Sequence, residues 1–413
     1  MTSEVRPFKI AVPEGELTKL KCKLNAASFP PDTAFSDDWE RGSPQADVKR
    51  LVARWKEGFD WRAAEAELNK IPQFTTSVDV DGFGSIEMHF VHQRSQDENA
   101  IPLLFCHGWP GGFWEVRKLL PLLTPQNVGE PSFHVVAPSH PNFGFSEEVA
   151  KPGFNGRKYA EAAHKVMLRL GYDKYVTQGG DWGYRITRAL DLLYPENVLA
   201  SHINMILADP PTLLQHPMLY LRALLTPHTA PEKAMLANVK KLMDKGMGYN
   251  LQQSTKPATI GFALADSPVA LLAWQYEKLI GWSDDDYRWG DDEVLTWASL
   301  YIFSRPGPAA SVRIYYEDTL GDDGFGDASG GIKESKRWNG AVPLGLSSFP
   351  RDMGALISSG RTLGPVVFER AHERGGHFPA TERPEVLAGD LKDMFSLSPG
   401  GFGRAVQDRL KLK

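Results

Sequence analysis

The sequence predicts an α/β protein built on a mostly parallel sheet, with helices on both faces and an inserted helical segment. Two apolar runs, 101–106 and 133–138, have the length of buried strands, and a helix is expected at 157–170. A strand at 172–176 is followed at once by a helical pattern, and a further strand is expected at 198–206. This repetition of strand and helix is typical of parallel sheets that are covered on both faces.

The length and charge of the chain limit what it can be. Its 413 residues suit a large core with additions, and its 11 Trp suit an aromatic-lined pocket. The net charge of -5 provides no basic surface for nucleic acid. Cys22 and Cys106 are far apart in the sequence, which argues against a disulfide framework and favours a reducing compartment. Cys106 is expected to be a buried free thiol.

No segment predicts an export signal or a membrane span. Residues 1–6 lack the apolar stretch of a secretory signal. No run reaches the ~18 apolar residues of a membrane helix. We therefore expect a soluble, cytoplasmic protein.

Residues 1–73 predict a first region made mainly of helices. A short strand is expected at 8–12, and Pro13, Ser43-Pro44 and Asp60 each mark the start of a helix. Apolar residues recur at helical spacing in all three helices. These stripes are expected to be packing surface laid over the rest of the chain.

The sheet is expected to lie in two parts, 74–210 and 339–413, separated by a helical cap at 211–338. The first part opens with a β-hairpin whose apolar residues alternate on both sides of Gly82-Phe83-Gly84. The expected cap helices are 219–225, 231–242, 268–280 and 293–304. The expected elements of the second part are strands at 341–349 and 364–370 and a helix at 384–395. The Gly-rich run 321–331 lacks the Gly-Lys-Ser/Thr of a phosphate loop and is expected to be a connector.

The stretch from Thr177 to Gly183 lies where a predicted strand meets a helix. Gly179 and Gly183 flank Asp181 at the second position on each side, which is the pattern of a strand-to-helix elbow that exposes a nucleophile. A carboxylate is ionised at neutral pH and forms an ester when it attacks. The expected target is therefore an electrophilic sp³ carbon. The alternative is a Gly-rich loop in which Asp181 is solvated or caps the helix.

The run His107-Gly108-Trp109-Pro110 follows the buried strand at 101–106. In an α/β-hydrolase layout this loop supplies one backbone N–H to an oxyanion, and the residue after the nucleophile, Trp182, supplies the other. A cis bond before Pro110 would fix the loop. An ordinary turn at a strand end is the alternative.

His377, within Gly375-Gly376-His377-Phe378, follows the last predicted strand, where a base could activate water. Asp352 follows the preceding strand and could orient the imidazole. The order Asp181, Asp352, His377 is the nucleophile-acid-base order of α/β-hydrolases. His372 is a weaker candidate because it lacks the glycine pair, and no metal-ligand cluster accompanies the two histidines. A surface histidine and a turn aspartate are the alternatives.

Together these motifs resemble those of epoxide hydrolases of the microsomal type, in their soluble fungal or bacterial form. The resemblance covers nearly the whole chain. Three motifs stand as in that family: His107-Gly108-Trp109-Pro110, Gly180-Asp181-Trp182-Gly183 and Gly375-Gly376-His377-Phe378. So does the cap stretch from Thr255-Lys256-Pro257 to Glu277-Lys278, and the helical region with Trp55 and Trp61 is similar to the family's N-terminal extension. Asn142 departs from the pattern, because Gly is frequent there.

The resemblance implies two cap tyrosines that hydrogen-bond the epoxide oxygen. Tyr249 matches the first and Tyr315 the second, with the adjacent Tyr316 as the alternative. An alkoxide is a poor leaving group, and donors of pKa ~10 stabilise it as the ring opens. The implied reaction forms a hydroxyalkyl ester on Asp181. Water activated by His377 and Asp352 then hydrolyses the ester to a vicinal diol, while the N–H groups of Trp109 and Trp182 stabilise the oxyanion.

The expected partners are a small hydrophobic epoxide and water, with no metal and no organic cofactor. Detoxification and biosynthesis are both compatible roles, and a homodimer is compatible with the resemblance alone. One alternative is a haloalkane dehalogenase, which also has Asp before Trp at the elbow but needs halide-binding donors in place of a tyrosine pair. Another is a catalytically silent relative that binds a hydrophobic small molecule, which would not need Asp181, Asp352 and His377 together.

Overall fold

The computed structural model describes residues 4–125, 129–319 and 334–412. In this part of the chain, nine strands form one sheet in the order β1-β2-β3-β5-β4-β6-β7-β8-β9. Strands β1, β2, β3 and β5 pair antiparallel, and all neighbours from β5 to β9 pair parallel. The predicted mostly parallel α/β sheet is therefore confirmed.

The buried strands carry the apolar runs that the sequence shows. Every residue of β4, β5 and β7 is buried, as expected for strands that are covered on both faces. The strands are β1 (Arg6–Phe8), β2 (Gln73–Val80), β3 (Gly84–Gln93), β4 (Ile101–Cys106), β5 (Phe133–Pro138), β6 (Tyr175–Gly179), β7 (Val198–Ile203), β8 (Leu344–Ser348) and β9 (Val366–Ala371). The predicted hairpin is the pair of β2 and β3, in which Phe74 lies opposite Phe90.

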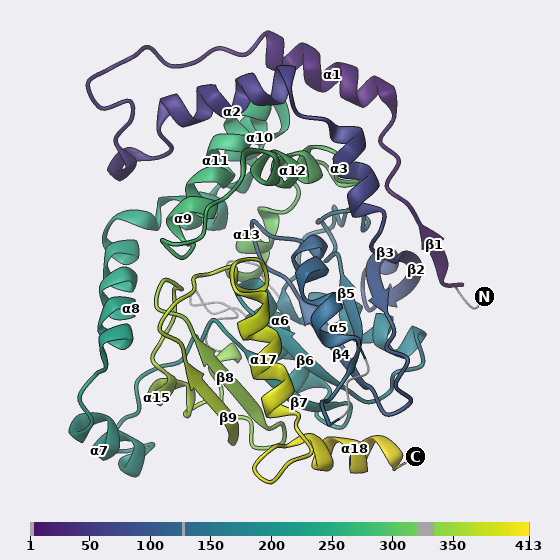
Figure 1. Cartoon of the computed structure of the whole chain (residues 1–413), viewed down its shortest axis with the longest axis vertical. Helices are drawn as coiled ribbons and strands as arrows, with labels where there is room; N and C mark the ends of the chain where they lie inside the picture. The colour runs from purple at the N-terminus through teal and green to yellow at the C-terminus, as the bar shows by residue number, and fades with distance from the viewer. Residues whose placement is uncertain (1–3, 126–128, 320–333, 413) are drawn as a thin grey trace.

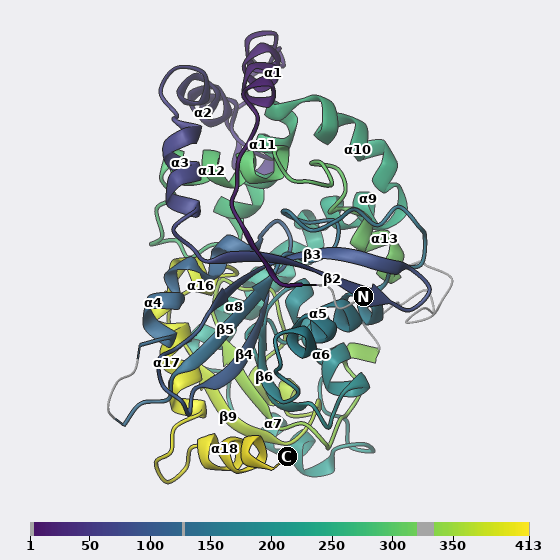
Figure 2. The same cartoon turned by 90° about the vertical axis from the view of Figure 1, so that its right-hand side faces the viewer.

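Helices cover both faces of the sheet. Figure 2 shows α4, α16 and α17 on one side of the sheet and α5 and α6 on the other. These helices are α4 (Leu120–Leu123), α5 (Gly156–Arg169), α6 (Trp182–Leu193), α16 (Pro379–Glu382) and α17 (Pro384–Met394). Two further helices lie near the sheet, α15 (Ile357–Gly360) and α18 (Gly403–Lys411). The sequence did not predict α18, a short helix beyond the end of the sheet.

The described part of the segment between β7 and β8 is mainly helical. Its helices are α7 (Pro217–Leu225), α8 (Ala230–Lys241), α9 (Gly248–Thr255), α10 (Pro257–Asp266), α11 (Pro268–Gly281), α12 (Asp291–Ile302) and α13 (Arg313–Thr319). In Figure 1, α9 to α13 lie above the sheet, and α7 and α8 lie at its left side. The sequence missed α9 and α10, two short helices separated by a single residue before Pro257. The predicted connector at 321–331 lies outside the described residues.

The N-terminal helices pack on this cap. Helices α1 (Glu14–Asn25), α2 (Gln45–Glu57) and α3 (Trp61–Leu68) contact α11 and α12. The Arg54 guanidinium donates two hydrogen bonds to the Asp292 carboxylate, of 2.9 and 2.8 Å. Ser43 Oγ donates to the carbonyl of Ala273 at 2.8 Å. Figure 1 shows the N-terminal helices lying against the cap, to which these hydrogen bonds join them.

Two predicted strands are placed differently. The strand expected at 8–12 ends at Phe8, because side chains replace a neighbouring strand beyond that point. The N–H of Ile10 donates to Asn69 at 2.8 Å, and the N–H of Val12 donates to Glu65 at 2.7 Å. The strand expected at 172–176 is β6, which begins at Tyr175 and includes the first glycine of the elbow.

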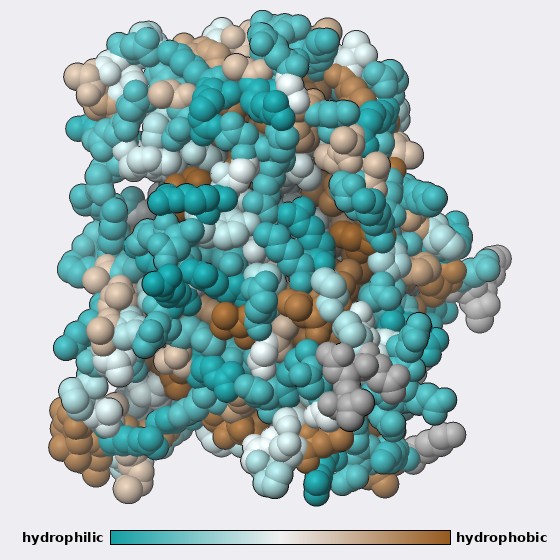
Figure 3. Space-filling model, in the orientation of Figure 1, coloured by the Kyte–Doolittle hydropathy of each residue, from teal (hydrophilic) through white to brown (hydrophobic). Residues whose placement is uncertain are grey.

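An apolar patch lies on α7 and the turn before it. Leu213, Leu214, Met218, Leu224 and Leu225 are all more than half exposed, and they form the brown group at the lower left of Figure 3. Within the described residues, no single helix has the length and apolarity needed to cross a membrane. Helices α10 and α11 meet both criteria only when taken together across a bend of 115°.

A fully buried ion pair ties α6 to the chain segments that lead into and out of β8. The Arg188 guanidinium donates to Asp191 at 3.0 Å and to the carbonyls of Ser335, Arg337 and Leu363. Both charged side chains are 0 % exposed. A buried pair of this kind is costly to break, because the remaining partner keeps an unpaired charge.

We expect Arg188→Met to lower the free energy of unfolding by about 3–5 kcal/mol, because it leaves Asp191 unpaired in the core. Urea unfolding followed by circular dichroism measures the loss. Arg54→Met is the matched control, since the Arg54–Asp292 pair is exposed to solvent and should contribute far less to stability. Equal losses in the two variants would contradict the structural role given to Arg188.

Candidate active site

Asp181 lies at a sharp elbow between β6 and α6. Its φ is +52° and its ψ is −126°, a conformation that non-glycine residues rarely adopt. The flanking glycines make the turn possible. A Cβ atom on Gly183 would lie 1.9 Å from the carbonyl oxygen of Cys106, and one on Gly179 would lie 2.5 Å from the carbonyl oxygen of Gly183. The small residues predicted around Asp181 are therefore required by backbone contacts.

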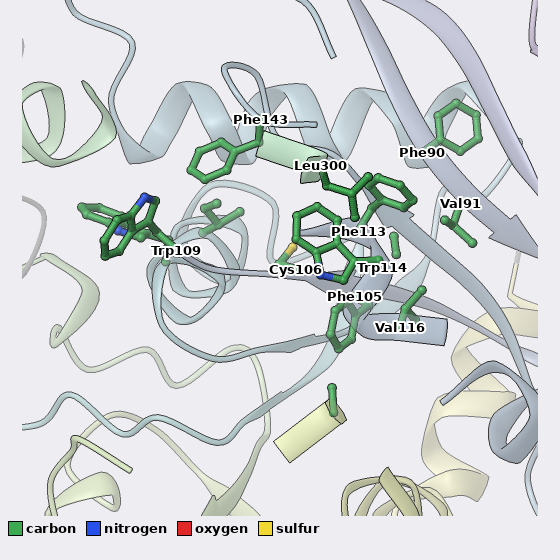
Figure 4. Packing of buried hydrophobic residues seen from close by; sticks show 14 of the residues in the cluster. Phe90, Val91, Phe105, Cys106, Trp109, Phe113, Trp114, Val116, Phe143 and Leu300 are labelled. Atoms are coloured by element: carbon green, nitrogen blue, oxygen red, sulfur yellow. The ribbon is translucent and has the colours of Figure 1, made fainter. Parts of the chain in front are cut away.

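The loop after β4 holds one oxygen of this carboxylate. The N–H of Trp109 donates to Asp181 Oδ1 at 2.8 Å, and the Trp109–Pro110 bond is cis, as expected. The cap fixes the loop from above, because Trp297 Nε1 donates to the Pro110 carbonyl and Tyr301 donates to the Gly111 carbonyl. In Figure 4, Cys106 lies between Trp109 and a buried group formed by Phe113, Trp114 and Leu300.

The second backbone donor expected at the site belongs to Trp182. Trp182 is the first residue of α6, where an N–H has no acceptor within its own helix. A helix N-terminus also carries a partial positive charge, which favours an anion beside it. The Trp109 N–H contacts the Asp181 carboxylate directly, and the Trp182 N–H stays the predicted second donor.

His377 lies between two carboxylates. Its Nδ1 is 2.7 Å from Asp352 Oδ1, and its Nε2 is 3.5 Å from Asp181 Oδ2. Asp352 Oδ1 also accepts from the N–H of Met353 at 2.7 Å, and its Oδ2 has no partner in the described chain. The segments after β6, β8 and β9 thus bring together Asp181, Asp352 and His377, the three residues that the sequence predicts at the site.

This arrangement favours the charged imidazole. Burial lowers the pKa of His377, but the charge of Asp352 and the proximity of Asp181 outweigh burial and raise the pKa to about 10. Burial raises the pKa of the Asp352 carboxyl, and His377 opposes that rise. We conclude that His377 is protonated at neutral pH when Asp352 and Asp181 both lie beside it as carboxylates.

His372 lies away from this cluster. Its Nε2 is 2.7 Å from Asp390 Oδ2, and its ring stacks on Phe349 with centroids 4.7 Å apart. Asp390 also accepts a hydrogen bond from Ser347 at 2.6 Å. His372 therefore belongs to a polar network that links β8, β9 and α17, and the choice of His377 over His372 agrees with the geometry.

Aromatic side chains from the cap face Asp181. The Tyr249 ring stacks on Trp109 with centroids 5.5 Å apart, and the Tyr315 ring meets Trp182 edge-on at 4.8 Å. The two tyrosine rings meet edge-on, with centroids 6.0 Å apart. Burial, with help from the charge of Asp181, raises the pKa of both hydroxyls. Tyr315 is 3 % exposed and Tyr316 is 37 % exposed, so Tyr315 is the member of the adjacent pair that lies at the site.

A small cavity adjoins Asp181 and His377. Its wall includes Glu115 and Gln178, to which the sequence analysis gave no role. Burial raises the pKa of Glu115 to about 8, and its carboxyl accepts from the N–H of Gly112 at 2.9 Å. The side-chain oxygen of Gln178 has no protein partner among the described residues. The signal for Glu115 was a lone acidic residue in the apolar run 113–116.

The site holds no arrangement typical of a metal centre. Over the described ranges, no three or more His, Cys, Asp or Glu side chains are grouped so that they could hold a metal ion. The chemistry derived below uses only side chains, backbone donors and water.

Comparisons with known proteins agree with this site. A family model described as "Epoxide hydrolase N terminus" matches residues 5–116, and one described as "alpha/beta hydrolase fold" matches residues 101–232. Epoxide hydrolase 1 of Sus scrofa is 33% identical over 418 residues, with 95% of this chain and 89% of that protein covered. The structure of Aspergillus niger epoxide hydrolase aligns with a TM-score of 0.77 and 31% identity, covering 94% of this chain and 95% of that one.

A third comparison extends across almost the whole chain. Juvenile hormone epoxide hydrolase from the silkworm Bombyx mori aligns with a TM-score of 0.84 at 26% identity, with 99% of this chain and 96% of that chain covered. The fold and the elbow together define an α/β-hydrolase that carries an aspartate at the nucleophile position. The chain belongs to the epoxide hydrolase family, and the reaction it performs is the hydrolysis of an epoxide to a diol.

We expect Gly183→Ala to disrupt the elbow, because the added methyl group would overlap the backbone of β4. Activity should fall at least about 100-fold, because a shift of the Asp181 carboxylate by about 1 Å can lower the rate that much. Gly389→Ala is the control, as this helical glycine has open space around it and alanine favours helices. Steady-state assays and thermal melts of both variants check the expectation, which fails if Gly183→Ala is as active as Gly389→Ala.

The raised pKa of His377 should appear in the pH dependence of stability. The pKa lies above the ordinary value of 6.5, so the ion pairs stabilise the fold fully below about pH 6.5. This contribution should decline as the pH rises from about 6.5 to 10. Urea unfolding of the wild type and of His377→Gln over this range tests it: the stability advantage of the wild type should shrink steadily. An advantage that stays constant would contradict the charged resting state.

Proposed function

We propose that this epoxide hydrolase acts through a covalent ester on Asp181. The observation that carries the proposal is the orientation of the elbow carboxylate, whose Oδ1 accepts the N–H of Trp109 while its Oδ2 lies toward His377. In the first step, Oδ2 attacks one epoxide carbon and the carbon–oxygen bond of the ring breaks. Oδ1 remains beside its donor and becomes the carbonyl oxygen of the ester.

Tyr249 and Tyr315 donate to the epoxide oxygen as the ring opens. A buried donor that is already in place stabilises the developing alkoxide without reorganisation of solvent. The two rings pack against each other and against Trp109, close enough to Asp181 for its charge to raise the pKa of both hydroxyls, which supports this assignment. One tyrosine transfers its proton to the oxygen, so the first step leaves a hydroxyalkyl ester and a tyrosinate.

Formation of the ester prepares the second step. Esterification removes the charge of Asp181, which is one of the two carboxylates that keep His377 protonated. The pKa of His377 therefore falls, and its proton can return through water to the tyrosinate. Neutral His377, oriented by Asp352, then takes a proton from water, and the resulting hydroxide attacks the ester carbonyl. The N–H groups of Trp109 and Trp182 stabilise the oxyanion before the diol leaves with a proton from His377.

The substrate assigned to this site is a small, hydrophobic epoxide. This assignment is supported by the aromatic rings that surround Asp181, which belong to Trp109, Trp182, Trp282, Tyr249 and Tyr315. In this scheme the core, 74–210 and 339–413, supplies nucleophile, base and acid. The cap, 211–338, supplies the tyrosines, and the extension, 1–73, supports the cap. A haloalkane dehalogenase would have no use for two tyrosine donors, since a halide leaves without a proton.

His377→Gln should accumulate the ester, because Asp181 attacks as an anion and does not need the imidazole, whereas the second step does. Mixed with styrene oxide, this variant should gain the mass of one substrate molecule, and peptide mapping should place the gain on residues 177–183. Asp181→Ala is the control and should gain nothing.

A single turnover of the wild type in ¹⁸O-water provides the opposing test. In the ester route the new oxygen of the first diol comes from Asp181, so the label enters the protein first. Label in the diol of the first turnover would mean direct attack by water, and Asp181 would then be a base at most.

A further inference from the structure

Lys278 lies in the middle of the aromatic cluster of the cap. It is the only buried lysine in the described part of the chain, with a side chain that is 3 % exposed. Its ammonium lies over the ring of Tyr249, 4.6 Å from the centroid, and is 5.7 Å from the centroids of both Trp274 and Trp282. Burying an ammonium is costly, so a cation held among three rings calls for an explanation.

The paired carboxylate does not supply that explanation. Lys278 pairs with Glu277, the preceding residue, whose side chain is 37 % exposed. An ion pair between these two residues could form equally well at the surface, where the ammonium would keep its water. The Lys278 nitrogen lies over the Tyr249 ring, within the distance of about 6 Å typical of cation–π contacts. The ion pair with Glu277 does not account for this position.

We propose that Lys278 is a positioning residue that makes Tyr249 a better proton donor to the epoxide oxygen. The inference rests on the proposed function, in which Tyr249 becomes a tyrosinate as the ring opens. Negative charge on the phenolate spreads into the ring that faces the ammonium. The attraction is consequently stronger in the transition state than before it, and only such a difference accelerates the reaction.

The surroundings of Tyr249 make this assistance necessary. Burial raises the pKa of the Tyr249 hydroxyl, and the charge of Asp181 raises it further. Both effects oppose transfer of its proton. The charge of Arg185 lowers the pKa of this hydroxyl, and the Lys278 ammonium, which lies directly over the ring, acts in the same sense as Arg185. The same nitrogen lies near Trp282, whose ring meets His377 edge-on at 5.1 Å, so Lys278 belongs to the wall of the site.

Single-turnover kinetics with excess enzyme and styrene oxide separate the two chemical steps. Lys278→Met should slow ester formation roughly tenfold, the scale of a desolvated cation–π contact, and leave ester hydrolysis unchanged. Lys278→Arg keeps the charge and should restore most of the rate. Lys256→Met removes an exposed lysine from the same cap and should behave as the wild type. If thermal melts show that Lys278→Met does not fold, Lys278→Gln replaces it under the same criteria.

A double variant tests whether Lys278 acts through Tyr249. In the Tyr249→Phe background, where Tyr315 still donates, adding Lys278→Met should slow ester formation no further. An equal loss in both backgrounds, or no loss in the single variant, would overturn the inference. The proposed function is tested separately. If the wild type forms no ester on Asp181, the proposed function is refuted, whatever the Lys278 variants do.

Discussion

One imidazole between two carboxylates is the interaction on which the chemistry of this protein depends. His377 holds Asp352 on one side and faces Asp181 on the other, and the fold delivers the three residues from loops after separate strands. The arrangement makes the state of the base depend on the state of the nucleophile. With Asp181 free, the imidazole is charged; with Asp181 esterified, one of the supporting charges is gone. In the proposed two-step scheme, this dependence keeps the steps in order.

The elbow imposes the second constraint. Asp181 is held at positive φ by a turn that leaves no room for a Cβ at Gly179 or Gly183. The same turn places the carboxylate next to the N–H of Trp109. The strain at one residue is thus linked to the position of the loop after β4, which the cap holds through hydrogen bonds to Pro110 and Gly111.

The sequence was sufficient for the parts of this architecture that depend on local pattern. The βα repetition predicted the sheet, and the glycine spacing around Asp181 predicted the elbow, because both reflect backbone geometry over a few residues. The sequence does not show where side chains take the place of a neighbouring strand, so the strand expected at 8–12 extends past the end of β1 at Phe8. The N–H groups of Ile10 and Val12 donate to Asn69 and Glu65, which lie far along the chain. The sequence also gave no role to Glu115 or Lys278. Only the folded chain places Glu115 near His377, and Lys278 over the ring of Tyr249.

The contact between the N-terminal helices and the cap has a consequence for protein engineering. In the proposed scheme the proton donors lie on the cap and the nucleophile lies on the core, so the position of the cap sets the distance between them. Part of that position is fixed by α2 and the turn before it, through the bonds from Arg54 to Asp292 and from Ser43 to Ala273. Residues at this contact never meet the substrate, yet a library restricted to pocket walls would leave out positions that shape the active site.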